Sequence, residues 1–263
     1  MSSTATPNFR FQRFTVWHDK CAMKVGTDGV LIGAWSQLPP MRRVRALDIG
    51  TGSGLVALML AQRLEEAHKE FQVQGIDVNR SAVNQAVQNF KISPWTNRLT
   101  CVPCALQEFQ SPMPFQLIAS NPPFFQDSMK NPNPDKADAR HTDKLTYSQL
   151  LHGVAQLLSD DGIFSVILPA TVESQFLTLA AWEGLLPVRI VHVHPKPKKP
   201  AKRVMMALQR AAMVGPVPPK VSTFLIESAT SPRSEQYEKL TKKFYLQTMN
   251  NATQQKDNEP LVW

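Results

Sequence analysis

The chain has 263 residues, 43% of them hydrophobic and 19% charged, a balance that indicates a globular protein and excludes a disordered or fibrous one. Lys and Arg number 29 against 21 Asp and Glu, and the resulting charge of +8 favours a polyanionic partner without deciding the fold. Three cysteines cannot all pair, which argues against a disulfide-rich secreted protein, and the longest apolar stretch, Leu55 to Ala61, is too short to span a membrane. The N-terminus lacks the apolar core of a signal peptide, so we expect a cytoplasmic protein.

Strand-like and helix-like segments alternate along the chain. Aromatic residues and Val between Phe9 and Trp17 give a loose strand signal, and Thr27-Asp28-Gly29 offers an N-cap for a short helix at Val30–Trp35. The other predicted strands cover Val44–Ile49, Gln72–Val78, Leu99–Val102, Phe115–Ser120, Ile163–Leu168, Val188–His194 and Val204–Leu208. The other predicted helices cover Leu55–Ala67, Ser81–Lys91, Tyr147–Leu158 and Thr171–Trp182.

This alternation predicts an α/β fold. A mostly parallel sheet with helices on both faces is expected, and the last two strands, joined by a basic loop, suit an antiparallel edge. We also expect Ser81 to cap its helix and the polar run Ser159-Asp160-Asp161-Gly162 to end the helix before it.

A glycine-rich loop follows the first strand of the alternating block. Gly50, Gly52 and Gly54 let the chain turn sharply and let a ligand approach the main chain, a pattern that dinucleotide-binding proteins also show. Asp48, just before the loop, would repel a pyrophosphate but attract the ammonium group of a methionine moiety, directly or through water. Asp77 ends the next strand, where a carboxylate reaches ribose hydroxyls. The two acids favour S-adenosylmethionine over NAD as the cofactor.

An Asn-Pro-Pro-Phe tetrapeptide, Asn121 to Phe124, follows the strand at Phe115–Ser120. The Asn121 side-chain oxygen and the Pro122 carbonyl can each accept one hydrogen of a planar amine, on adenine or on a glutamine amide. This grip frees the nitrogen lone pair to attack a sulfonium methyl group, and no strong base is needed. Pro123 fixes the backbone and Phe124 offers a stacking face. The alternative is a proline turn that merely closes a strand.

These motifs together resemble the class I S-adenosylmethionine-dependent methyltransferases with an Asn-Pro-Pro-aromatic motif. More narrowly, Cys21–Trp35 (CAMKVGTDGVLIGAW), Leu47–Arg63 (LDIGTGSGLVALMLAQR) and Ser93–Trp95 resemble the bacterial tRNA1(Val) (adenine(37)-N6)-methyltransferase family. The likeness extends from about Phe9 to Leu246. The segment Cys21–Trp35 is its specific part, because many methyltransferases share the other motifs.

The resemblance implies a Rossmann-like class I methyltransferase domain with a seven-stranded sheet at residues 44–246. Residues 1–43 are expected to be a segment folded over the cofactor and target site. The polar residues 247–263 are expected to form a flexible tail.

The expected cofactor is S-adenosylmethionine. In place of an acid that the family usually carries after the third strand, this chain has Ala105, so recognition of the cofactor's adenine is expected from backbone amides around Leu106 or from Gln107. The full set of expected cofactor-binding residues is Lys24, Thr27, Asp28, Asp48, Gly50, Gly52, Gly54, Asp77, Val78, Ala105, Leu106 and Asn121. Of these, Lys24, Thr27 and Asp28 are implied only by the resemblance, which places them near the cofactor or the target base.

The expected macromolecular partner is tRNA. A proline-spaced run of cations, Lys196, Lys198, Lys199, Lys202 and Arg203, lies between the last two predicted strands, although such runs are often only solvated faces. The expected substrate-binding residues are Pro123, Phe124, Arg140, His141, Lys196, Lys198 and Lys199. No metal site is expected, because His192 and His194 lack a third ligand, and Cys101 and Cys104 are expected to be structural.

The sequence thus favours methyl transfer from S-adenosylmethionine to N6 of adenosine 37 in tRNA1(Val), by an enzyme expected to be a monomer. One alternative is a glutamine methyltransferase that acts on a peptide release factor, although the chain has only about 40 residues before its first core strand, too few for the larger N-terminal helical domain expected there. Another is a different RNA adenine-N6 methyltransferase. A non-catalytic RNA-binding module is disfavoured, because Asp48, Asp77 and Asn121 are all present.

Overall fold

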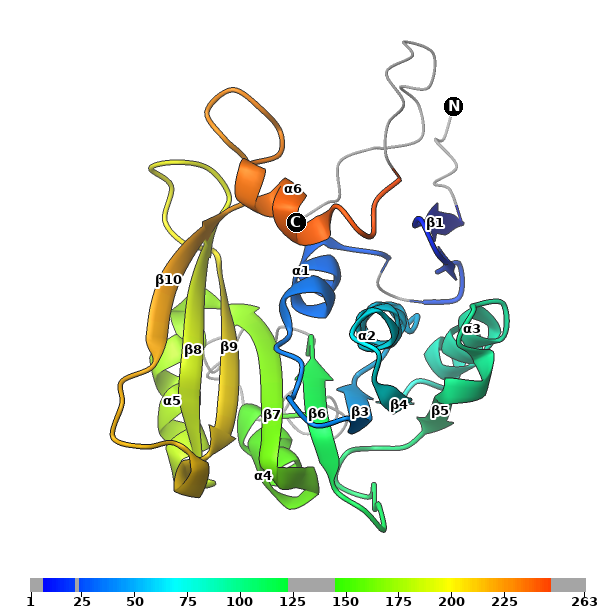
Figure 1. Cartoon of the computed structure of the whole chain (residues 1–263), viewed down its shortest axis with the longest axis horizontal. Helices are drawn as coiled ribbons and strands as arrows, with labels where there is room; N and C mark the ends of the chain where they lie inside the picture. Colours follow the sequence, from blue (N-terminus) through cyan, green and yellow to red (C-terminus); the bar gives the residue numbers. More distant parts are fainter. Residues whose placement is uncertain (1–6, 22–23, 123–144, 247–263) are drawn as a thin grey trace, which may run out of the picture.

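The structure, a computed structural model, describes residues 7–21, 24–122 and 145–246. At its centre is an eight-stranded sheet with the order β10-β8-β9-β7-β6-β3-β4-β5 (Figure 1). Its strands are β3 (Arg43–Ile49), β4 (Glu70–Asp77), β5 (Leu99–Pro103), β6 (Phe115–Ser120), β7 (Leu158–Pro169), β8 (Leu185–His194), β9 (Arg203–Arg210) and β10 (Lys220–Leu225). Within the sheet only β9 runs against the other strands, so the predicted mostly parallel sheet and the antiparallel pairing of β8 with β9 are confirmed. Their predicted position at the edge is wrong, because β10 pairs in parallel with β8 outside them.

Helices cover both faces of the sheet, as predicted. On one face α1, α2, α3 and α6 contribute to one apolar cluster, and on the other α4 and α5 contribute to a second (Figure 1). The helices are α1 (Thr27–Trp35), α2 (Leu55–Glu66), α3 (Arg80–Lys91), α4 (Tyr147–Leu157), α5 (Glu173–Trp182) and α6 (Glu235–Thr241). Short 3-10 helices lie at Thr96–Arg98, Ala170–Val172 and Ala211–Met213.

Two elements near the carboxyl end of the described chain were not predicted. Strand β10 is an eighth strand beyond the seven expected, and it pairs in parallel with β8 at the edge of the sheet. Its pattern is weak because Val221 is exposed and Phe224 is the one buried residue of this strand. Helix α6 is only seven residues long, and the Ser234 hydroxyl caps it by accepting from the Tyr237 backbone N–H.

Two predicted helix caps are wrong. Asn79, and not Ser81, caps α3: its side-chain oxygen accepts hydrogen bonds from the backbone N–H groups of Ser81 and Ala82, at 2.9 and 3.2 Å. Helix α1 already begins at Thr27, and the residue at its N-cap position is Gly26, which has no capping side chain.

The polar run Ser159–Gly162 does not form a loop after α4. Strand β7 begins at Leu158, directly after the helix, and its pairing jumps from Phe115–Leu158 to Leu117–Ile163. The intervening residues therefore form a bulge within the strand, with Asp160 and Asp161 exposed to water.

The N-terminal residues form a small hairpin that packs against the last described residues. Strands β1 (Asn8–Arg10) and β2 (Thr15–Trp17) are antiparallel. Phe11, in the turn between them, forms a bridge with Tyr245 and stacks on Phe14 with ring centroids 4.7 Å apart. The two distant ends of the described chain thus share one aromatic cluster.

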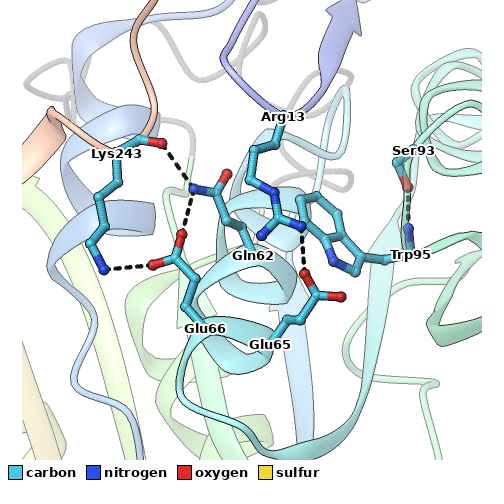
Figure 2. Close-up of polar contacts among 7 residues, drawn as sticks. All are labelled: Arg13, Gln62, Glu65, Glu66, Ser93, Trp95 and Lys243. Carbon is cyan, nitrogen blue, oxygen red and sulfur yellow. Dashed lines mark hydrogen bonds and ion pairs between the residues drawn. The ribbon is translucent and has the colours of Figure 1, made fainter.

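Polar contacts attach this cluster to α2 (Figure 2). Arg13 of the hairpin pairs with Glu65 at 2.6 Å and lies over the ring of Trp95. Lys243 pairs with Glu66 at 2.8 Å, and its carbonyl accepts a hydrogen bond from Gln62. Helix α2 therefore contacts both ends of the described chain, and its first residue follows the glycine loop.

Candidate functional site

The carboxyl ends of three neighbouring strands bring the predicted motifs together. Strand β3 lies between β4 and β6, and Ile49 at its end is in register with Ile76 of β4 and Ser120 of β6. The glycine loop, Asp77 and Asn121 therefore share one edge of the sheet, the position where parallel α/β sheets bind ligands.

The glycine loop has the backbone that its sequence predicts. Gly50, Gly52 and Gly54 have φ angles of 71°, 54° and 83°, which residues with a side chain rarely adopt. A Cβ at Gly50 or Gly52 would meet no atom within 4 Å, so these two residues face open space. A Cβ at Gly54 would collide with the ring of Phe90 on α3, so this glycine also permits close packing of the helices.

Asp48 lies beneath the loop and is almost completely buried. Its Oδ2 accepts hydrogen bonds from the Thr51 hydroxyl at 2.7 Å and the Ala57 backbone N–H at 3.1 Å. Burial raises the pKa of this carboxyl group to about 7, against the lowering effect of the two hydrogen bonds. A cation bound nearby would favour the ionised form, which is consistent with an ammonium group over the loop.

Asp77 joins the loop to the next strand. Its two carboxylate oxygens accept hydrogen bonds from the backbone N–H groups of Gly52 and Asn79, both at 2.9 Å. Each oxygen keeps capacity for a further donor such as a ribose hydroxyl. The adjacent Val78 is 65% exposed and offers an apolar surface beside these oxygens. Asp77 and Val78 thus suit the ribose and the base of one nucleoside.

The N-terminal segment reaches this edge of the sheet. Burial, followed by the negative charges of Asp77 and Asp19, raises the pKa of the Cys21 thiol to about 11. The influence of Asp77 on this thiol is consistent with an N-terminal segment that lies near the end of β4.

Asn89 of α3 is a residue that the sequence analysis missed. It is fully buried, its Nδ2 donates to the carbonyls of Trp17 and Ser53 at 2.8 Å each, and its Oδ1 accepts from the Trp17 backbone N–H at 2.9 Å. One side chain thus joins the N-terminal hairpin to the glycine loop. An Asn inside the predicted helix Ser81–Lys91 gave only a weak signal of this role.

Asn121 carries an unused acceptor at the end of β6. Its Oδ1 is buried and has no hydrogen-bond partner among the described residues. Its Nδ2 lies 3.9 Å from the position that a Cβ on Gly29 of α1 would take, so α1 borders this side chain. The Ser120 hydroxyl donates to the Ile49 carbonyl at 2.9 Å and fixes the end of β6 against β3. Pro122 is buried beside it.

Four of the expected substrate-binding residues, Pro123, Phe124, Arg140 and His141, lie outside the described residues.

Asp28, in the first turn of α1, has a partner within the protein. The Arg203 guanidinium at the start of β9 donates to its Oδ2 at 2.9 Å, and the two side chains are only 16% and 18% exposed. Burial raises the pKa of Asp28, and the bond to Arg203 opposes this shift. Thr27 is buried in the same turn, whereas Lys24 is exposed. The ion pair joins α1 to the end of the basic loop.

The segment that follows β5 packs against α4. The Cys104 backbone N–H donates to the Asp77 carbonyl at 3.1 Å, which holds this segment beside the end of β4. Leu106 is buried against Gly153, and Ala105 is half-buried. The expected contact of backbone amides near Leu106 with an adenine stays a prediction.

The basic loop follows β8 at the same edge of the sheet, on the side away from α3. Lys196 forms an ion pair with Glu227 at 3.0 Å, whereas Lys198 and Lys199 are exposed. Lys198 has a φ of 64°, and the Lys199 backbone N–H donates to the Lys196 carbonyl, so the loop makes a tight turn.

The histidines and cysteines that the sequence analysis discounted form no metal site or disulfide among the described residues. His192 pairs with Glu173 at 2.7 Å, and Cys101 and Cys104 are free thiols. Within residues 7–21, 24–122 and 145–246, no group of three or more His, Cys, Asp or Glu is arranged to hold a metal ion. None of the helices in these ranges has the length and apolar character needed to cross a lipid bilayer.

Comparison with known proteins identifies the family. Residues 30–179 match the model of the methyltransferase small domain. The tRNA1(Val) (adenine(37)-N6)-methyltransferase of Bacteroides fragilis is 43% identical over 91% of this chain and 98% of its own, and that of Proteus mirabilis is 36% identical over 90% and 93%. The crystal structure of a predicted O-methyltransferase from Agrobacterium tumefaciens, 14% identical, superposes with a TM-score of 0.60 over 82% of this chain and 96% of its own, which supports the fold. The chain therefore belongs to the methyltransferase small-domain family of S-adenosylmethionine-dependent enzymes, and within it to the group named tRNA1(Val) (adenine(37)-N6)-methyltransferase.

Proposed function

We propose that this enzyme transfers a methyl group from S-adenosylmethionine to N6 of adenosine 37, beside the anticodon of tRNA1(Val). The observation that carries the proposal is the buried Oδ1 of Asn121 at the end of β6, next to the glycine loop, and this oxygen has no hydrogen-bond partner in the part of the chain that the structure describes. A buried acceptor without a partner is costly, and a donor supplied by the substrate would relieve that cost. Relatives with this printed activity match nearly the whole chain.

Asn121 and Pro122 would prepare the amine for attack. The Asn121 Oδ1 would accept one hydrogen of the adenine amine and the Pro122 carbonyl the other, which weakens conjugation of the nitrogen lone pair with the ring. S-adenosylmethionine, when bound, supplies the electrophilic methyl group. The amine loses its extra proton only after the methyl group has been transferred. Asn121 and Pro122 therefore need only orient the amine, and neither acts as a base.

The cofactor would be held by the residues at the ends of β3 and β4. The open space over Gly50 and Gly52 suits its methionine part, with Asp48 beneath providing negative charge. Asp77 would accept hydrogen bonds from the ribose hydroxyls, and Val78 would contact the adenine. The N-terminal segment would cover this site, a role supported by the bonds of Asn89 to Trp17.

Replacement of Asp77 should weaken the binding of S-adenosylmethionine. We expect Asp77→Ala to cost about 1.5–3 kcal/mol, because a charged acceptor of ribose hydroxyls is lost. Asp77→Asn keeps the size and one acceptor oxygen, so its loss should be smaller. Titration calorimetry measures both affinities. An affinity equal to that of the wild type in the Ala variant would remove Asp77 from the cofactor site.

Neutral substitutions in the basic loop should weaken the binding of tRNA. We expect the triple variant Lys196→Gln, Lys198→Gln and Lys199→Gln to reduce the slope of log affinity against log salt by up to about 0.7–0.9 for each lost phosphate contact. Lys196→Gln alone should contribute least, because Glu227 already neutralises this side chain. A slope unchanged in the triple variant would show that the loop is only a solvated surface.

The proposed reaction is tested with total tRNA, labelled cofactor and mass spectrometry of the nucleosides. We expect N6-methyladenosine in the purified valine tRNA, and its loss when the gene is deleted. If that nucleoside persisted in the deletion strain while glutamine methylation of a release factor disappeared, the alternative function would be correct. N6-methyladenosine in a different RNA would keep the chemistry and change the substrate.

A further inference from the structure

We propose that a hollow between Lys20 and α3 binds backbone phosphates of the substrate RNA, as a second contact separate from the basic loop. The proposal rests on the proposed function, since it takes the substrate to be tRNA. The hollow has a volume of about 560 Å³ and is lined by Lys20, Ser81, Asn84, Val87, Gln88 and Lys91.

The hollow follows one stripe of α3. Ser81, Asn84, Gln88 and Lys91 recur at spacings of three and four residues, so their side chains lie on one face of the helix. The stripe is about 15 Å long at 1.5 Å of rise per residue. Lys20 closes the opposite side: its backbone N–H donates to Gln85 Oε1 at 3.2 Å, which fixes the N-terminal segment against the helix.

The chemistry of the hollow suits an anion. Its lining contains two ammonium groups, a hydroxyl and two amides, and no carboxylate. The Lys20 ammonium donates only to the neutral Gln88 Oε1, at 3.3 Å, and neither lysine forms an ion pair with another described residue. The basic loop differs in this respect, because Glu227 and Asp28 already pair with Lys196 and Arg203.

The position of the hollow suits a substrate that extends across the site. Helix α3 begins directly after Asp77, Val78 and Asn79, beside the proposed cofactor site. In the sheet order, α3 covers β4 and β5 on one side of Asn121, whereas the basic loop joins β8 and β9 on the other (Figure 1). A nucleic acid that presents one base to Asn121 can therefore place backbone phosphates on both sides of it, which a small substrate cannot do.

The test is the salt dependence of tRNA binding by Lys20→Gln, Lys91→Gln and the double variant. Each substitution should reduce the slope of log affinity against log salt by about 0.7–0.9, which corresponds to about five- to eightfold weaker binding at 0.1 M salt. The KM for tRNA should rise while kcat and the affinity for S-adenosylmethionine stay unchanged. Both lysines are exposed, so the variants should fold normally.

Two sets of variants serve as controls. Lys220→Gln removes an exposed lysine at the start of β10, at the opposite edge of the sheet, and should leave the slope unchanged. Lys20→Arg and Lys91→Arg keep the charge and should keep the slope. If Lys20→Gln and Lys91→Gln had the same slope as Lys220→Gln while the wild-type enzyme methylated the tRNA, this inference would be wrong and the proposed function would stand. A wild-type enzyme that neither binds nor methylates tRNA would overturn the inference and the proposed function together.

Discussion

Asn121→Ala should lower turnover by about 10²–10³-fold and leave the affinity for S-adenosylmethionine almost unchanged. The size follows from the loss of one preorganised polar contact to the reacting group. The structure gives the physical reason: Oδ1 has no hydrogen-bond partner among the described residues, so no bond to one of them has to break before it accepts a hydrogen from the substrate. Single-turnover methylation of valine tRNA, with calorimetry of cofactor binding, measures the two effects separately.

The matched variant at this position is Asn121→Asp. It keeps the shape and an acceptor oxygen, so it should retain more activity than Asn121→Ala. If the Ala variant kept activity within a factor of about three of the wild type, the role of Asn121 as an acceptor would be wrong. An equal loss in cofactor affinity and turnover would instead assign Asn121 to cofactor binding.

Asn89→Leu should destabilise the protein by about 3 kcal/mol. The substitution keeps the approximate volume but removes three hydrogen bonds of 2.8–2.9 Å. It leaves the buried Ser53 carbonyl and the part-buried backbone groups of Trp17 without the Asn89 partner. Because the same bonds hold the glycine loop, the affinity for S-adenosylmethionine should fall as well. Denaturant unfolding measures the first effect and calorimetry the second.

The control for Asn89 is Asn84→Leu, on the exposed face of the same helix. It should change the free energy of unfolding by no more than about 0.5 kcal/mol, because Asn84 has no buried partner to lose. Equal stability of the two variants would show that the hairpin and the glycine loop do not depend on Asn89.

The central elements were predictable because their signals are local. The β-rich run Val44–Ile49 and the apolar run after Gly54 predicted β3 and α2 in nearly the observed positions. The caps were harder to predict because neighbouring polar residues can serve equally well. Asn79 and Ser81 are both favourable N-cap residues, and in the structure the Asn79 side chain accepts the capping hydrogen bonds. The edge strand β10 was missed because one exposed face and an edge position weaken the alternation of apolar residues.

The site was predictable only in part, for a related reason. Asp48, Asp77 and Asn121 stand at the ends of predicted strands, so topology alone brings them to one edge of the sheet. The pairing of Asp28 with Arg203 joins residues 175 positions apart, and no local pattern records it. The three bonds of Asn89 are hidden for the same reason.

The bridge between Phe11 and Tyr245 can form only after nearly all of the described chain has been synthesised. The hairpin that contains Phe11 is synthesised first, but some of its partners are among the last described residues. The Gln12 side chain, for example, donates to the carbonyl of Tyr245, 233 residues later. Contacts so distant in sequence form late in folding, because a long loop has to close before they can contribute. A nascent chain that stops short of residue 244 would lack the contacts of Phe11 and Gln12 with Tyr245. Its hairpin would keep the packing of Phe14 on Trp95 and the bonds of Asn89 to Trp17. The last described residues thus complete the packing of the first described ones, and this part of the structure requires nearly the whole described chain.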